Sequence, residues 1–311
     1  MQGFFFSLTF LIFYKFINFL IINSNFNLFY SKICSYFEIS ILNFTSHICF
    51  MVYKTDYHMH SLYSDGRSVP EEYVLAAIAE GMMEIGFSEH LTLFKDKEEW
   101  NMNPVDISPY INHLERLRNT TKEIKVKIGL EVDYFAGKEK ETIDFLSQFP
   151  LDYIIGSVHY LGEKTVDFGP EFYEGKSIDR LFESYFDSVC EAASSGVFDI
   201  IGHCDLIRIY GYKPASDQDE HYRKLAKIMK KHDVTFEVNT NGRNRPLADF
   251  YPDRKFLHIF REEKVSVCVN SDAHMPARVG QYFDEAYDLL RYVGYTEMAV
   301  FDKRVRRMVP F

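Results

Sequence analysis

Short apolar runs and longer amphipathic segments alternate along most of this chain. Seven short runs rich in β-branched and aromatic residues predict strands at residues 55–60, 84–90, 126–134, 153–160, 199–205, 235–240 and 265–274. Between several of them apolar residues recur every three or four positions, which predicts helices at residues 68–81, 108–123, 177–196 and 219–233. Strands that alternate with helices indicate a parallel α/β sheet with right-handed crossovers. No internal repeat or Pro/Gly-rich linker divides residues 51–311, so we expect one domain there.

The first predicted helix carries start and stop signals of its own. Ser68 and Glu71 have the spacing of a capping box, and Pro70 falls in the first turn. Gly81 follows the last apolar residue of the pattern, where a helix commonly ends. We therefore expect a helix that is capped by the Ser68 side chain.

Residues 1–50 differ in composition from the rest of the chain. They contain no Ala, Val, Pro, Asp or Arg, and residues 3–22 are almost continuously apolar. This run is long enough for a membrane anchor, but Lys15 would lie in mid-span. A secretory signal is disfavoured, because no basic region precedes the run and no small-residue cleavage site follows it. The residue types are those of A/T-rich codons and Met51 directly precedes the first predicted strand, so we favour an upstream extension from a misplaced start, with an anchor as second choice.

The net charge and the cysteine content indicate which partners and which cellular compartment to expect. The formal net charge is -10 and no Lys/Arg cluster is visible, so we expect no nucleic-acid partner. Beyond residue 50 the cysteines are an odd set without CxxC spacing, which argues against a disulfide framework or a thiolate zinc site. These features predict a cytoplasmic protein, with no membrane association if translation starts at Met51.

Nearly every predicted strand ends in a side chain that can bind a metal ion. These residues are His58, His60, His90, Glu131, His159, His203, Asp272 and His274, and Asp65 follows the first strand closely. Functional groups of parallel α/β folds collect at the carboxyl ends of the strands, and they converge on one point only when the sheet closes. An open, doubly wound sheet would spread them across its width. We therefore expect a distorted (β/α)7 barrel related to the TIM barrel, with a metal site at the C-terminal ends of its strands.

The composition of this set indicates divalent metal chemistry. A single histidine at a strand end is more often structural, but six imidazoles at one barrel mouth would leave polar groups unsatisfied without a metal. Imidazole and carboxylate without thiolate suit Zn, Mn or Fe. The ligands are too many for one ion and sufficient for two or three. Clustered divalent ions are typical of phosphoester hydrolysis.

The motifs that carry these residues resemble those of a known superfamily. "DYHMHSLYSDG", "GFSEH", "GLEVDY", "IGSVHY", "IGHCDLIR" and "NSDAH" occur in an order similar to that of the polymerase-and-histidinol-phosphatase (PHP) superfamily, and the closest likeness is to its histidinol-phosphatase family. The resemblance runs from about residue 55 to the C-terminus. It implies a (β/α)7 barrel and hydrolysis of the small phosphomonoester L-histidinol phosphate in histidine biosynthesis, by in-line attack of a metal-bridging hydroxide at a trinuclear site.

Carried over motif by motif, the resemblance also implies how the ligands are shared. The first ion would be bound by His58, His60, Glu131 and Asp272. Glu131 would bridge to a second ion held by His159 and His203, and a third would be bound by Asp65, His90 and His274. Among these, we expect Glu131, His159 and Asp272 to be catalytic.

The sequence departs from the family at its phosphate-binding arginine. After "TFEVNT" the family usually has a small residue, Gly, a variable residue and Arg, whereas this chain has Asn244 at the last position. Arg243 and Arg245 flank it, and either would supply forked phosphate binding after a small shift of the loop. Arg208, with Asp205 in "GHCDLIR", is either a substrate-binding or supporting group or part of an exposed ion pair.

Two further segments are predicted to lie at the barrel mouth. Residues 161–176 would form a loop over the barrel mouth, unless they are a plain surface connection, and Trp100 with residues 95–99 would line the same mouth.

Three other functions compete with the phosphatase. The first rival is a PHP-type exonuclease or phosphodiesterase, which requires a basic groove with stacking aromatics. The others are a metal-binding scaffold without catalysis and a membrane-anchored protein, the latter resting on residues 1–50 alone.

Overall fold

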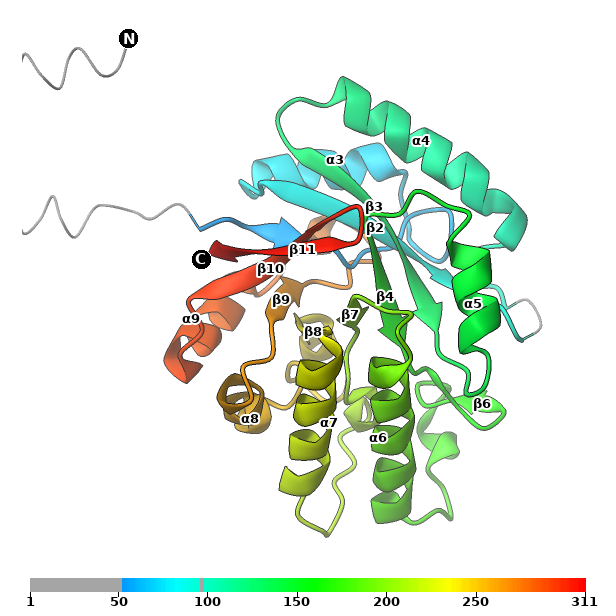
Figure 1. Cartoon of the computed structure of the whole chain (residues 1–311), viewed down its shortest axis with the longest axis vertical. Helices are drawn as coiled ribbons and strands as arrows, with labels where there is room; N and C mark the ends of the chain where they lie inside the picture. Colours follow the sequence, from blue (N-terminus) through cyan, green and yellow to red (C-terminus); the bar gives the residue numbers. More distant parts are fainter. Residues whose placement is uncertain (1–51, 96–97) are drawn as a thin grey trace, which may run out of the picture. The chain divides into compact units, whose positions relative to one another are not determined.

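Seven parallel strands form the central sheet of this protein, whose computed structural model describes residues 52–95 and 98–311 (Figure 1). Their order is β1-β2-β3-β4-β7-β8-β9, and every neighbouring pair is parallel. The bounds are β1 Thr55–Asp56, β2 Glu84–Leu91, β3 Lys125–Asp133, β4 Tyr153–Ser157, β7 Ile200–Ile201, β8 Thr235–Asn239 and β9 Val267–Asn270. Residues 52–311 form one compact unit, whereas the expected extension at residues 1–50 lies outside the described residues.

The sheet curls until its first and last strands meet. Just beyond β1 and β9, the amide of His60 donates to the carbonyl of Ala273 at 3.0 Å, and the amide of Ala273 donates to the carbonyl of His58 at 3.2 Å. These bonds form a parallel bridge between Met59 and Ala273. The predicted distorted (β/α)7 barrel is therefore confirmed, with its seam held together beside two of the predicted metal ligands.

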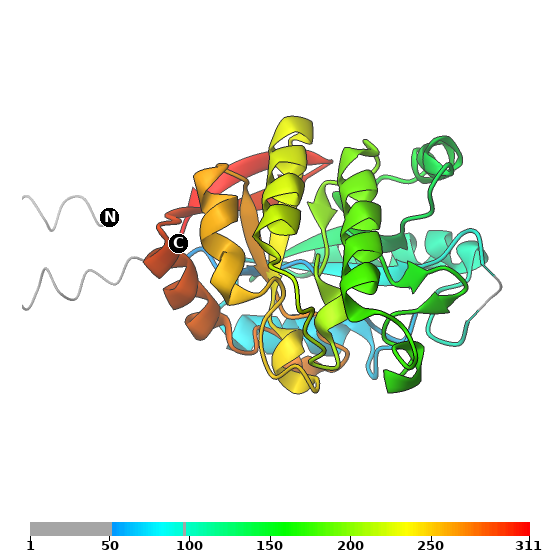
Figure 2. The ribbon, with the colours of Figure 1, turned by 90° about the horizontal axis from the view of Figure 1, so that it is seen from below.

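Helices follow the strands and lie on the outside of the barrel, as the two views show (Figures 1 and 2). Their bounds are α3 Pro70–Ala79, α4 Ile107–Thr120, α5 Glu139–Leu146, α6 Ile178–Ser194, α7 Asp219–His232, α8 Leu257–Glu262 and α9 Phe283–Val293. Four of them match the helices expected from periodicity within a few residues. The expected capping box is wrong, because Val69 is the N-cap of α3 and no side chain caps it. The Ser68 carbonyl instead accepts a hydrogen bond from the Leu62 amide, so this residue holds the preceding loop.

A large aromatic side chain fills the barrel beneath the strand ends. The hydroxyl of Tyr153 donates to the carbonyls of Tyr57 and Phe87 at 2.6 and 2.9 Å, so it links β4 with the segment after β1 and with β2. Gly86 and Gly129 make room for it, since a Cβ atom at either position would lie 2.4 Å from an atom of the Tyr153 side chain. The barrel is thus a packed core and not a channel.

An antiparallel hairpin covers the ends at which the strands begin. It consists of β10 (Glu297–Asp302) and β11 (Val305–Pro310), drawn in red in Figure 1. Lys127 pairs with Asp302 at 2.7 Å, and the Arg304 side chain pairs with Asp199 just before β7. A second hairpin, of β5 (Tyr160–Leu161) and β6 (Lys164–Thr165), follows His159 at the opposite end. One end of the barrel is therefore closed, and the other carries the side chains described next.

Candidate metal centre

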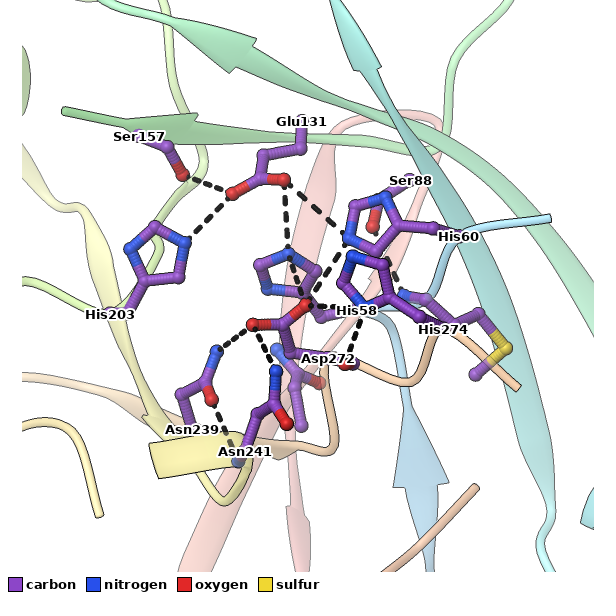
Figure 3. Close-up of polar contacts among 12 residues, drawn as sticks. His58, His60, Ser88, Glu131, Ser157, His203, Asn239, Asn241, Asp272 and His274 are labelled. Carbon is purple, nitrogen blue, oxygen red and sulfur yellow. Dashed lines mark hydrogen bonds and ion pairs between the residues drawn. The ribbon is translucent and has the colours of Figure 1, made fainter. Parts of the chain in front are cut away.

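Glu131 lies at the centre of the cluster formed at the strand ends (Figure 3). It is fully buried near the end of β3, and two of the surrounding imidazoles contact different oxygens of its carboxylate. His90 Nδ1 lies 2.7 Å from Oε2, and His203 Nε2 lies 2.9 Å from Oε1. His58 Nε2 approaches Oε2 to 3.2 Å, and His159 Nε2 approaches Oε1 to 3.6 Å. Both oxygens of this carboxylate therefore face imidazoles, an arrangement that fits the bridging role implied by the resemblance.

The seam between β1 and β9 supplies the next part of the cluster. His60 Nε2 lies 3.3 Å from Asp272 Oδ1, and His58 Nε2 lies 3.9 Å from the same oxygen. The two histidines alternate with Met59, so their side chains share the face of the chain that points into the barrel mouth. Asn239 and Asn241 each donate to the other Asp272 oxygen at 3.3 Å, which fixes the carboxylate (Figure 3).

A third group forms where the loop after β1 meets β2 and the segment after β9. Asp65 Oδ2 lies 3.3 Å from His274 Nε2, and Asp65 Oδ1 lies 3.7 Å from His90 Nε2. His60, Asp65, His90 and His274 offer ligand atoms that all lie within 4.8 Å of one another. His90 contributes one ring nitrogen to this group and the other to Glu131. All nine predicted metal ligands thus come together in one cluster.

The pKa values of the titratable groups in the cluster depend on their neighbours. Burial alone would raise the pKa of Glu131, but the imidazoles of His58, His90 and His159 hold that pKa well below its usual range. Burial together with the neighbouring His90 and His274 lowers the pKa of His60 to about 3. His60 is therefore neutral at pH 7, which is the state in which imidazole binds a metal.

Two buried carboxylates that the sequence analysis missed orient these histidines. Glu237 on β8 contacts His58 Nδ1 at 3.0 Å, and Asp133 on β3 contacts His159 Nδ1 at 2.8 Å. Each contact leaves Nε2 of the histidine facing Glu131. Metal-binding histidines commonly donate their second ring N–H to a carboxylate in this way. A signal was present, since an acidic residue inside an apolar strand such as "TFEVNT" requires a partner.

The polar atoms at the centre of the cluster fit bound divalent ions. His58 Nε2, His60 Nε2, His90 Nδ1 and Glu131 Oε2 are buried and lie as close as 2.7 Å to one another, yet none of them forms a hydrogen bond with a described residue. Leaving one buried polar atom unpaired costs about 1–3 kcal/mol, so four such atoms that face one another require a common partner. Nitrogen and carboxylate donors without sulfur suit Zn, Mn or Fe.

Six residues of the cluster line a cavity of about 500 Å³, namely Asp65, His90, His159, His203, Asp272 and His274. Trp100 and residues 163–165, 167 and 168 of the insert after His159 contribute to its walls, as the sequence predicts. The Trp100 ring packs edge-on against His90 at 5.0 Å. Asp167 and Glu98 also line the cavity, and neither carboxylate forms an ion pair within the described part of the chain.

Only one of the three predicted substrate-binding arginines lines this cavity. Arg245 does so, and its guanidinium forms no hydrogen bond or ion pair with any described residue. Arg208 is buried in a network with Asp205 and Asp253, at 2.8 and 3.3 Å, and Arg243 pairs with Glu285 at 2.9 Å. Arg208 is thus part of an ion pair that is buried and not exposed. This geometry favours Arg245 as the residue that meets a substrate.

Comparisons with known proteins agree with the site. The PHP domain family matches residues 56–241. A probable histidinol-phosphatase of Deinococcus radiodurans is 33% identical over 246 residues, which cover 77% of this chain and 93% of the relative. The histidinol-phosphatase of Bacillus subtilis is 26% identical over 74% of this chain and 97% of its own length.

A solved structure extends this similarity to three dimensions. The crystal structure of histidinol phosphate phosphatase from Lactococcus lactis, complexed with zinc, L-histidinol and phosphate, has a TM-score of 0.71 and 26% identity. The match covers 82% of this chain and 99% of that one. The described part of this chain contains no helix long and apolar enough to cross a membrane.

Proposed function

This chain belongs to the PHP domain family, and we propose on that basis that it is a histidinol-phosphatase that hydrolyses L-histidinol phosphate to L-histidinol and phosphate. The observation that carries the proposal is the convergence of nine ligands on a buried cluster whose central atoms lack hydrogen-bond partners. A metal-binding scaffold without catalysis is disfavoured, because all nine ligands are present and six of them line one cavity.

Two or three divalent ions would be shared among the ligands as the sequence implies. His58, His60 and Asp272 would hold one, His159 and His203 a second, and Glu131 would bridge them. Asp65, His90 and His274 would hold the third. When bound, such ions lower the pKa of water and neutralise charge on a phosphoryl group. The residues themselves orient the ligand atoms: Glu237 and Asp133 set the ring nitrogens, and the Asn239 and Asn241 amides set Asp272.

The cavity walls support a substrate that carries charges of both signs. The unpaired guanidinium of Arg245 suits a phosphate, which it can bind through two N–H groups. The unpaired carboxylates of Asp167 and Glu98 suit the ammonium group of L-histidinol phosphate, and Trp100 offers an aromatic face for its imidazole. Acidic walls oppose a nucleic-acid strand, which disfavours the nuclease alternative.

The three cysteines of the described residues are free and buried, which supports a reducing compartment such as the cytoplasm, where histidine biosynthesis would place this enzyme.

Phosphate release from L-histidinol phosphate by the full chain, loaded with Mn or Zn, tests the function. We expect it to exceed release from p-nitrophenyl phosphate and bis-p-nitrophenyl phosphate, and to be lost in His159→Ala. Faster turnover of the diester would move the protein to the nuclease branch of the family. A protein that holds its metal but hydrolyses no phosphoester would support the scaffold alternative.

A further inference from the structure

Glu89 is a fully buried carboxylate that does not face the metal ligands. It precedes His90 on β2, and successive side chains of a strand point to opposite faces. His90 points into the barrel mouth, so Glu89 points to the other side of the strand. A buried carboxylate is costly unless it is fully hydrogen-bonded, which makes its partners informative.

All the hydrogen-bond partners of the Glu89 side chain belong to the loop that carries Asp65. Both carboxylate oxygens accept from the amide of Ser61 at 3.0 Å. One oxygen also accepts from the Ser61 hydroxyl, and the other accepts from the Ser64 hydroxyl. The carboxylate therefore bridges two residues of a single turn.

This turn is closed and has no room to adjust. The carbonyl of Ser61 accepts from the amides of Ser64 and Gly66 at 3.1 and 3.0 Å. A Cβ atom at Gly66 would lie 1.9 Å from the carbonyl oxygen of His60, so only glycine permits this approach. Asp65 lies between these fixed points, and its position follows from theirs.

We propose that Glu89 is a positioning residue that fixes Asp65 opposite His90 and His274, so that these three can bind one divalent ion. The inference rests on the proposed function. One strand then serves the same ion twice, since His90 contributes a ligand directly and Glu89 places another ligand from the neighbouring loop. Supporting groups of this kind typically change metal affinity by about 10–100-fold.

Glu89→Gln in the full chain tests this role, because the new amide nitrogen would face the Ser61 amide, which can only donate, and one serine hydroxyl would have to turn from donor to acceptor. We expect the affinity for one ion to fall by roughly 10–100-fold while the remaining ions stay bound. The readouts are metal content after dialysis against a weak chelator and the absorption spectrum of the Co(II)-loaded protein. Ser64→Ala, which removes one bond on the loop side, should shift both in the same direction by a smaller amount.

Glu84→Gln is the matched control for loss of stability. Glu84 is also buried on β2, but it lies at the opposite end of the strand and accepts from the hydroxyls of Tyr53 and Tyr57 at 2.6 and 2.5 Å. It should lower the melting temperature without changing the metal content. Equal metal retention by Glu89→Gln and the parent, or equal loss in both variants, would overturn the role of Glu89. A parent protein that binds no metal would instead overturn the proposed function itself.

Discussion

Replacing Glu237 by glutamine tests a residue that supports the metal centre without being one of its predicted ligands. Glu237 is fully buried, and its side chain is surrounded by donors only. Oε1 accepts from the His203 amide at 2.7 Å and from Asn239 Nδ2 at 2.9 Å, and Oε2 accepts from Asn270 Nδ2 at 2.8 Å. His58 Nδ1 lies 3.1 and 3.0 Å from the two oxygens.

The expected loss of folding stability depends on which Glu237 oxygen the new amide nitrogen replaces. At the Oε1 position it would face both the His203 amide and Asn239, so Oε2 is the less costly choice. One N–H of Asn270 Nδ2 then loses its acceptor, and only the weak contact to Cys268 Sγ at 3.5 Å is left to this nitrogen. Asn270 cannot reverse its amide because its Oδ1 accepts from the Tyr57 amide at 2.9 Å. One unpaired buried donor costs about 1–3 kcal/mol. Because His58 loses its carboxylate partner, metal affinity should also fall by about 10–100-fold.

Two measurements on the full chain check these values. Urea denaturation of metal-free protein should show the loss of about 1–3 kcal/mol, and competition with a chelator should show the weaker metal binding. Asp152→Asn is the control, because Asp152 is buried before β4, where the strands begin, and accepts from the Ile128 amide at 2.9 Å. It should lose stability and keep its metal affinity. Parental metal affinity in Glu237→Gln would refute the assignment of Glu237 as the group that orients His58.

Three further results are expected. Gly129→Ala should lower stability by about 1–3 kcal/mol in urea denaturation, because the new methyl overlaps the Tyr153 ring; parental stability would contradict this packing. Asp167→Asn should raise KM for L-histidinol phosphate about tenfold without affecting p-nitrophenyl phosphate, whereas Glu174→Gln on the same insert should change neither; equal effects on both substrates would exclude recognition of the ammonium group. Iodoacetamide should label Cys190, Cys204 and Cys268 only after unfolding, as site-resolved mass spectrometry can show, since burial raises the pKa of the Cys190 thiol to about 11; labelling of any of these three in the folded protein would contradict this.

The barrel and its ligands were predictable because two periodic signals coincide in the sequence. Apolar runs mark the strands, and polar residues that follow them mark the ends at which parallel strands converge. This logic predicted that Glu131 and its eight companions converge, and the structure brings these residues together. It overestimated β1 and β7, which have two residues each, because the chain after β1 forms only an isolated bridge at Met59, and the chain after β7 turns at residues 203–205.

The remaining helices and strands are too short or too exposed to give a periodic pattern of apolar residues in the sequence. Helices α5 and α8 have 8 and 6 residues, too few to establish a helical period. The β10–β11 hairpin has exposed residues on much of β11, so its pattern does not mark a buried strand. The substrate-binding arginine was ambiguous for a different reason. Arg208 pairs with the nearby Asp205, but the partners Asp253 of Arg208 and Glu285 of Arg243 lie far away in the sequence, and no local pattern reveals them.

The supporting carboxylates and the groups that would meet the substrate lie in different parts of the fold. Glu89 and Asp133 lie one and two residues from the ligands His90 and Glu131 on the same strands. A strand that places one ligand therefore also carries the support of another, Asp65 for Glu89 and His159 for Asp133. The groups that would meet the substrate, among them Trp100, Asp167 and Arg245, lie in loops and a short insert. Loops accept substitutions that strands do not, because fewer buried bonds depend on them. Changes at the loop positions should therefore alter the substrate while the ions stay bound, whereas changes at the buried carboxylates should weaken ion binding whatever the substrate.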